Sequence, residues 1–290
     1  MQELINGLLD TSGVVDLFQP EALLYLLLIV GLMWGGKLLY AASLPYDLMP
    51  AIADQDNKAA TLSLSGFMFG LGLVLWGALT AHGLPSLFQD LVDMAIVGAL
   101  GVALLHVGQL VSDRFIFPGF AIRESIAKEN LAAGVAEGGG YVATGLIVMR
   151  AVAIDGVSFW VRLADSVIFF ALAQVGFILF AAVYRRTIRY DARKAIEMGN
   201  VAAGISQGLT FIAMGAVLSY AIRQTGSLAV FGCWFVLSGV LLVAFRIFVD
   251  RVLLPGHSLD EEIERDNNWG IAFVEGGLAI VLSLILTGAF

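Results

Sequence analysis

Two glutamates lie inside long apolar runs at equivalent places in the chain. Glu137 and Glu275 follow Asn130 and Asn268 at the same spacing, and the first run stays apolar through Val148. That spacing is close to two helical turns, so each Asn–Glu pair shares a helix face and the carboxyl group lies roughly 10 Å deeper along the axis. A charged carboxylate at that depth in lipid costs on the order of 3 kcal/mol and usually faces a bundle interior.

A carboxyl group in an apolar layer can hold or release a proton, because burial disfavours its charged form. The sequence therefore predicts an ion or proton pathway that uses Glu137 and Glu275. The other two copies of the motif have Leu64 and Gln207 at the matching positions, which favours a two-fold pair over a four-fold acidic ring. The structural alternative is a protonated glutamate that hydrogen-bonds a backbone group or a serine.

Asparagines and glycines mark the starts of the motif helices. Asparagine is a good N-cap, and glycines spaced four residues apart let helices approach closely. We interpret these residues as caps and packing positions, with a central pathway lined by small residues as the alternative. The predicted helix starts are Asn57, Asn130, Asn200 and Asn268, and the predicted packing positions are Gly134, Gly138, Gly204, Gly208 and Gly276.

Other chemistries lack a matching pattern. His82, His106 and His257 are far apart in the sequence and show no zinc-ligand spacing, and His106 is expected to make a local hydrogen bond. The glycines at 138–140 follow no strand and precede no Lys-Ser/Thr pair, so they are not a phosphate loop. No nucleophile–base pair stands out. We therefore predict no metal, no cofactor, no catalytic residue and no enzymatic activity.

The composition is that of a polytopic membrane protein. The chain has 290 residues, of which 59% are hydrophobic and 14% charged, and its mean hydropathy is +0.88; soluble domains are about 25% charged. The net charge of -8 without a basic face excludes nucleic acid as a partner. The single cysteine, Cys233, cannot form an internal disulfide.

Apolar runs long enough to span a bilayer repeat along the whole chain. They predict an all-α bundle of eight transmembrane helices, and residues 1–20 are expected to form a short amphipathic interfacial segment. The runs are 22–42, 59–81, 91–111, 131–153, 163–184, 201–222, 228–249 and 269–289.

Charge predicts the orientation. Lysines and arginines gather in the loops after the first, third, fifth and seventh runs, whereas the opposite side keeps only Arg150, Arg162 and Arg223. The positive-inside rule then places the four basic loops in the cytoplasm and both termini outside.

The chain also repeats itself. Tyr46-Asp47 recurs as Tyr190-Asp191, and Pro118-Gly119 recurs as Pro255-Gly256. We predict two four-helix membrane repeats, at residues 1–153 and 154–290, parallel in the membrane and related by a pseudo-two-fold axis along its normal. A weaker repeat lies within each half, where a helix is followed by a loop that ends in asparagine and by a second helix.

The motif residues resemble a known family. The stretch from Tyr46-Asp47 to Asn57-Lys58 resembles the first signature of YjfL-like inner-membrane proteins, a bacterial family of unknown function that is typically four helices long, and residues 130–134 resemble the second. Residues 200–203 and 268–270 repeat both, although Trp269-Gly270 replaces Ala-Ala in the last copy. The resemblance implies a bacterial inner-membrane protein tied to envelope stress and supplies no catalytic residue.

Two functions from different classes follow. The first is an ion or small-solute pathway that uses proton exchange at the two glutamates. The second is a membrane scaffold whose cytoplasmic loops recruit envelope-stress proteins. A pathway needs polar residues along a connected interior, whereas a scaffold needs only exposed loop chemistry. The expected partners are the lipid bilayer and, for the scaffold, cytoplasmic or membrane-associated stress proteins.

Overall fold

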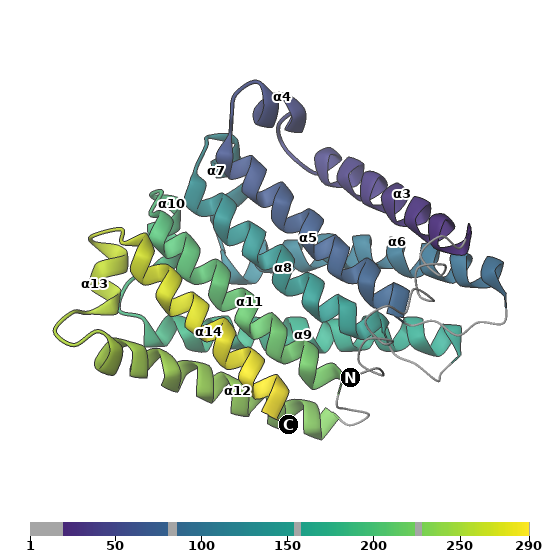
Figure 1. Cartoon of the computed structure of the whole chain (residues 1–290). Helices are drawn as coiled ribbons and strands as arrows, with labels where there is room; N and C mark the ends of the chain where they lie inside the picture. The colour runs from purple at the N-terminus through teal and green to yellow at the C-terminus, as the bar shows by residue number, and fades with distance from the viewer. Residues whose placement is uncertain (1–19, 81–85, 154–157, 224–227, 290) are drawn as a thin grey trace, which may run out of the picture.

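The computed structural model describes residues 20–80, 86–153, 158–223 and 228–289, and the regular structure within them is helical (Figure 1). The helices long and apolar enough to cross a membrane number eight in this part of the chain, which confirms the predicted class. The predicted interfacial segment and His82 fall outside the described residues, apart from Pro20. The long helices are α3 (Pro20–Ala42), α5 (Lys58–Thr80), α6 (Leu87–Val111), α8 (Leu131–Val152), α9 (Phe159–Thr187), α11 (Val201–Arg223), α12 (Leu228–Phe248) and α14 (Trp269–Ala289).

Short helices lie together at one end of the long ones (Figure 1). Two turns of π-helix extend α6 and α12 toward this end, which we call the short-helix end. The short helices are α4 (Leu48–Ala53), α7 (Ile122–Ala127), α10 (Ala192–Glu197) and α13 (Leu259–Glu264), and the π turns are η1 (Ser112–Ile116) and η2 (Val249–Leu253).

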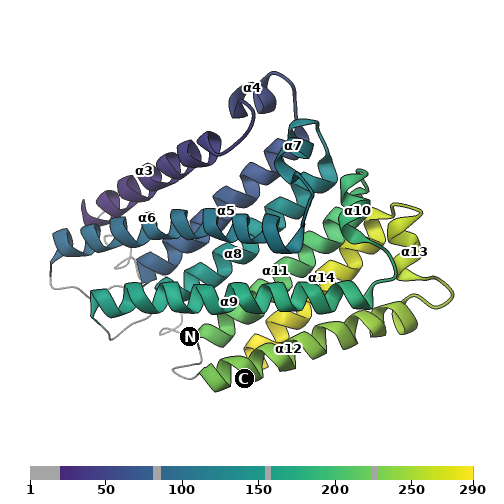
Figure 2. The same ribbon diagram turned by 180° about the vertical axis from the view of Figure 1, so that it is seen from behind.

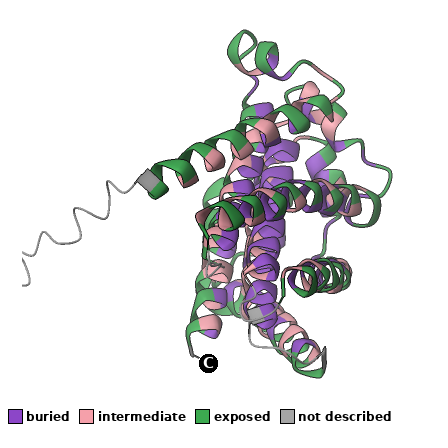
Figure 3. Ribbon diagram, turned by 90° about the vertical axis from the view of Figure 1, so that its right-hand side faces the viewer, coloured by how far each residue is buried: buried purple, intermediate pink, exposed green. Residues whose placement is uncertain are grey.

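The long helices form two layers. Helices α5, α8, α11 and α14 pack side by side in that order as an inner row. Helices α3, α6, α9 and α12 cover one face of this row, as the view from behind shows (Figure 2). Buried residues gather in the middle of the molecule and exposed ones on the outer helices (Figure 3). The predicted parallel relation of two four-helix repeats stays a prediction.

Glycines set the spacing of the inner row. A β-carbon at Gly66 would lie 2.3 Å from the Cα of Gly138, and one at Gly139 would lie 2.4 Å from the Cα of Gly208. No side chain fits at these contacts, so the helices α5, α8 and α11 touch backbone to backbone. Close approach through small residues is how helices associate in lipid, where burial of apolar surface gives no driving force.

A left-handed residue precedes each asparagine of the motif. Asp56, Glu129, Gly199 and Asn267 have φ angles of 51°, 63°, 83° and 48°. The left-handed region is unfavourable for residues with a β-carbon, so glycine is expected there, yet only one of the four positions has it. This turn redirects the chain from each short helix into the next inner helix.

Candidate functional site

Glu137 lies at the centre of a buried polar group that we call the first cluster (Tyr40, Ser63, Gln109, Arg123 and Glu137). Glu137 is 1% exposed. The Ser63 hydroxyl donates a hydrogen bond to Glu137 Oε2, and Gln109 Nε2 donates one of 3.0 Å to Oε1. Arg123 Nε is 3.6 Å from the same Oε1. Tyr40 and Ser63 are joined by a hydrogen bond of 2.7 Å between their hydroxyl oxygens.

Several elements meet at the first cluster. Tyr40 comes from α3, Ser63 from α5, Gln109 from α6 and Glu137 from α8, whereas Arg123 reaches in from the short helix α7. Gln109 Nε2 also donates a hydrogen bond of 2.9 Å to Asp113 in η1. The cluster therefore connects the membrane interior to groups at the short-helix end.

A second cluster (Tyr184, Ser206, Arg246, Asp260 and Glu275) surrounds the other glutamate. Glu275 is 4% exposed. It accepts hydrogen bonds from Ser206 Oγ at 2.6 Å, from the Tyr184 hydroxyl at 3.0 Å and from Arg246 Nε at 2.7 Å. Arg246 also forms an ion pair of 2.7 Å with Asp260 on α13.

The two clusters match in most positions but differ in where the cation originates. Tyrosine, serine and glutamate recur at equivalent places of the two halves, whereas Gln109 of α6 is replaced by Arg246 of α12, and Arg123 of α7 by Asp260 of α13. The carboxylate of Glu275 therefore has a close guanidinium partner, and that of Glu137 a more distant one. Glu137 is the less compensated carboxylate and the better candidate for proton exchange.

Tyr46, in the loop after α3, lies near the first cluster and is half-buried. Burial and, after it, the negative charge of Glu137 raise the pKa of Tyr46 to about 12. Its phenol therefore stays neutral at physiological pH and supplies no charge to the cluster.

An aromatic layer lies next to the first cluster. The rings of Tyr40 and Phe67 stack with centroids 4.8 Å apart, and Phe67 meets Tyr141 edge to face at 5.3 Å. The His106 ring meets Phe67 at 5.4 Å, and its Nδ1 lies 2.8 Å from the Val102 carbonyl oxygen. These contacts make His106 part of the packing.

A line of contact between α6, α8 and α9, which we call the seam, holds further buried polar groups. A β-carbon at Gly108 would lie 2.6 Å from Thr144 Cγ2 and 3.3 Å from Gln174 Nε2, so these two side chains meet at Gly108. Gln174 is 4% exposed, and within the described residues neither its amide nitrogen nor its amide oxygen has a hydrogen-bond partner. At the far end of the seam Arg162 pairs with Asp93.

Beside Glu275 there is a small cavity, lined by Tyr184, Thr210, Arg246 and apolar side chains. The space open to water centres is about 20 Å³, enough for one water molecule.

The predicted pair Glu137 and Glu275 does not share one cavity. The two residues lie on α8 and α14, with α11 between these helices. Each has its own set of partners. The glutamates are thus centres of two separate sites.

The predicted asparagines cap their helices and also bridge to a later part of the chain. The side-chain oxygens of Asn57, Asn130, Asn200 and Asn268 accept hydrogen bonds from backbone N–H groups three residues on, at 2.9 to 3.2 Å. The amides of the first three each donate a bond of 2.8 Å to a carbonyl of the following short helix, at Ile126, Ile196 and Ile263.

The predicted packing glycines all lie where inner helices touch. A β-carbon at any of them would come within 3.0 Å of a neighbouring helix. The neighbouring atoms are the carbonyl oxygens of Ala59 for Gly134, Leu62 for Gly138, Ala132 for Gly204 and Val135 for Gly208, and the β-carbon of Leu209 for Gly276.

Sequence reasoning missed most partners of the glutamates. The charge pattern indicates only a loop position for Arg123 and Arg246, and no motif distinguishes the serines and tyrosines. A residue-by-residue comparison of the two halves could have found the serines and tyrosines, because the same residue types recur in both. Among the described residues no group of three His, Cys, Asp or Glu side chains could hold a metal ion.

A family model described as Domain of Unknown Function (DUF350) matches residues 5–152 and again residues 158–290. The chain belongs to the DUF350 family. Each DUF350 copy contains one complete cluster. The chain is also similar to a UPF0719 transmembrane protein of Aquifex aeolicus (strain VF5), with 23% identity over 228 residues that cover 74% of this chain and 80% of the relative. No solved structure matches the chain.

These matches confirm the coarser part of the predicted resemblance. The chain is a transmembrane protein from a family of unknown function, and the family's domain matches it twice in tandem. The eight apolar helices make it a multi-pass membrane protein.

Proposed function

We propose that the protein moves protons, alone or coupled to a cation or small solute, along the seam between α6, α8 and α9, with Glu137 as the exchanging group. The observation that carries the proposal is the buried carboxyl group of Glu137, held by Ser63 and Gln109 and only distantly paired with Arg123. Intramembrane carboxyl groups in such settings are the usual elements of proton relays.

The order of polar groups along the seam supports this proposal. Asp113, Gln109 and Glu137 lie toward the short-helix end, Gln174 and Thr144 follow, and the Arg162–Asp93 pair stands at the far end. The unpaired amide of Gln174 would be satisfied by a water molecule, since buried polar groups are seldom left without partners.

A closed section separates Gln174 from Arg162. At the rise of an α-helix the two residues are roughly 18 Å apart along α9, and the buried apolar residues Phe170 and Ala173 lie between them. A transporter must close its path at some point of its cycle, so this state corresponds to a closed one. Opening would require α9 to move relative to α6 and α8.

The location and orientation are part of the proposal. The resemblance to YjfL-like proteins supports a bacterial inner membrane, and the basic loops support a cytoplasmic short-helix end with both termini outside. Glu137 and Asp113, which both accept a hydrogen bond from the Gln109 amide, would then be the carboxyl groups that exchange protons with the cytoplasm.

Proton flux into proteoliposomes tests the proposal. The purified protein is reconstituted with an internal pH-sensitive dye, and a potassium diffusion potential set with valinomycin drives the flux. We expect Glu137→Gln to abolish the flux and Gln174→Leu to lower it by about tenfold, because a leucine cannot hold the bridging water.

Glu275→Gln is the matched comparison, since Glu275 lies in a separate cluster away from the seam. It should retain most of the flux of the wild type. An absence of wild-type flux at either polarity, or full flux through Glu137→Gln, would overturn the proposal.

A scaffold is the second candidate, favoured by the exposed charges of α13. Arg265 is 69% exposed and lies 3.7 Å from Glu261 and 2.9 Å from Asp266. A cytoplasmic protein tied to envelope stress would dock on these charges. Charge reversal at Glu261 and Glu264 should then abolish its co-purification without changing folded yield, and unchanged co-purification would count against a scaffold of this kind.

A further inference from the structure

The inner row ends at α14 with a copy of its own packing surface left unused. Within the row, Gly139 of α8 meets Gly208 of α11 at backbone distance. The residue of α14 equivalent to Gly139 is Gly277, because Glu275-Gly276-Gly277 repeats residues 137–139. Nothing lies within 4 Å of a β-carbon at Gly277. The position that would receive the next helix is therefore open.

The other end of the row carries the complementary surface. Residues Asn57 to Ser65 of α5 align with Asn200 to Gly208 of α11, so Ser65 is the equivalent of Gly208. Ser65 is exposed, and Phe69 one turn further along α5 is 62% exposed. Helix α5 thus presents to its surroundings the face by which α11 packs on α8.

The asparagine bridges stop at the α14 edge. We call each short helix together with the inner helix that follows it a unit (α4–α5, α7–α8, α10–α11 and α13–α14). Asn130 and Asn200 each donate to the short helix of the next unit, but Asn268 belongs to the last unit. Its amide donates instead to Glu262 Oε2 on its own α13, at 2.8 Å. The equivalent acceptor is the Ile52 carbonyl of α4, and the amides of the four motif asparagines all donate elsewhere.

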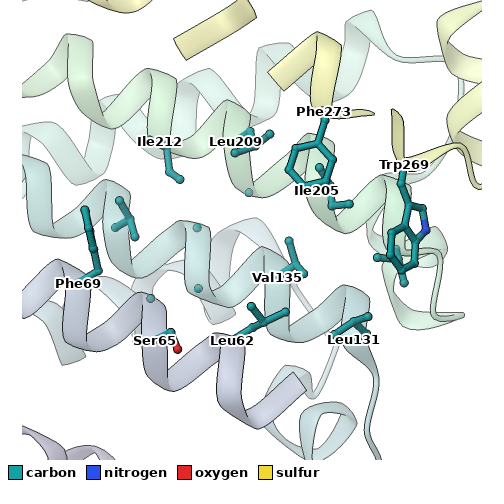
Figure 4. A pocket seen from close by; sticks show the side chains of 16 residues that line it. Leu62, Ser65, Phe69, Leu131, Val135, Ile205, Leu209, Ile212, Trp269 and Phe273 are labelled. Carbon is teal, nitrogen blue, oxygen red and sulfur yellow. The ribbon is translucent and has the colours of Figure 1, made fainter. Parts of the chain in front are cut away.

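An apolar groove of about 430 Å³ on the inner row is lined by residues of all four inner helices. Leu62 and Phe69 of α5 form one rim and Trp269 and Phe273 of α14 the other, as the close-up shows (Figure 4). The two free edges of the row therefore border one groove.

We infer that a second copy of this chain completes the row, with α14 of each copy packed on α5 of the other. All four inner helices start at an asparagine of the short-helix end and run in the same direction. A two-fold axis along the helices keeps that direction, so α14 meets the partner's α5 as α8 meets α11. The contact forms twice, as a closed dimer requires. Exposed apolar side chains alone would suit lipid; the open position at Gly277 and the Ile52 carbonyl without an asparagine bridge fit a second copy.

Disulfide cross-linking in native membranes tests this contact. Ser65→Cys and Phe273→Cys are combined in a Cys233→Ser background, because their equivalents within the row, Gly208 and Val135, lie in direct contact. Mild oxidation should convert most of the double variant into a covalent dimer. The two single variants, and Val175→Cys on the outer face of α9, should stay monomeric.

A packing variant provides the independent measurement. Gly277→Leu has open space around it in one copy, so folded yield should remain normal while the cross-linked fraction falls by about tenfold. Gly139→Leu is the matched control and should lose folded yield. If the double variant cross-links no more than the single variants do, the inference is overturned, and lipid chains are the occupants of the groove. A ladder of larger products would overturn the closed pair, and so would full cross-linking with Gly277→Leu.

Discussion

At the scale of single residues, the origin of the guanidinium distinguishes the two clusters. Arg246 is shared by Glu275 and Asp260, all three nearly buried, whereas Arg123 approaches Glu137 from a short helix. Removing one member of a buried charged set leaves the others without compensation, which costs far more than the set contributes when intact.

This arrangement makes a prediction for Arg246→Gln, which places glutamine where the first cluster has Gln109. We expect the variant to lose about 3 kcal/mol of unfolding free energy, because Glu275 and Asp260 remain buried without a cation. Unfolding in a mild detergent, followed by tryptophan fluorescence, measures the loss.

The matched variant adds Asp260→Arg to Arg246→Gln and so copies the first cluster into the second. Its guanidinium would come from α13, as Arg123 comes from α7. We expect the double variant to recover a large part of the lost stability. A double variant less stable than the single one would show that the clusters are not interchangeable.

At the scale of helices, the asparagines carry two tasks at once. Asn130 caps α8 through Ala133 N–H and holds α10 through the Ile196 carbonyl, whereas Asn268 caps α14 and bonds only within its own unit. Comparing variants of Asn130 and Asn268 therefore separates the stability that a helix cap contributes from the stability that a bridge to another unit contributes.

We expect Asn130→Ala to destabilise the protein by about 2 kcal/mol, the sum of a lost cap and an unpaired carbonyl. Asn268→Ala should cost less, about 1 kcal/mol, since it loses a cap and a side-chain bond to Glu262 but leaves no backbone carbonyl of another short helix unpaired. Hydrogen exchange should also show α10 opening faster in Asn130→Ala alone. Equal losses in the two variants, with unchanged exchange in α10, would contradict the bridging role.

At the scale of the whole molecule, the basic loops and the short helices lie at one end. If that end is cytoplasmic, single cysteines at the exposed positions Asp47 and Lys194, in a Cys233→Ser background, should resist an impermeant thiol reagent in intact cells. They should react after the membrane is permeabilised. Efficient labelling of both positions in intact cells would reverse the orientation.

The eight spans could be predicted because each is a continuous apolar run of bilayer length. The order of helices in the row could not, because every lipid-exposed or buried face is apolar and only a few glycines distinguish neighbours. The left-handed turns before the asparagines could not be predicted either, since three of the four positions, Asp56, Glu129 and Asn267, are not glycine. The spacing of Asn130 and Glu137 pointed to the first cluster, but the position of Arg123 depends on how α7 folds back.

The asparagine bridges also determine the order in which they can form during synthesis. The amides of Asn57, Asn130 and Asn200 each bond to a short helix that is made later in the chain. During synthesis at the ribosome, the asparagine amide of a unit already inserted in the bilayer therefore has no carbonyl acceptor until the next short helix has been made. Each bridge would therefore form only after the next unit has been made, in order from the N-terminal unit to the C-terminal unit. A nascent chain stalled before α10 would leave the Asn130 amide without its acceptor.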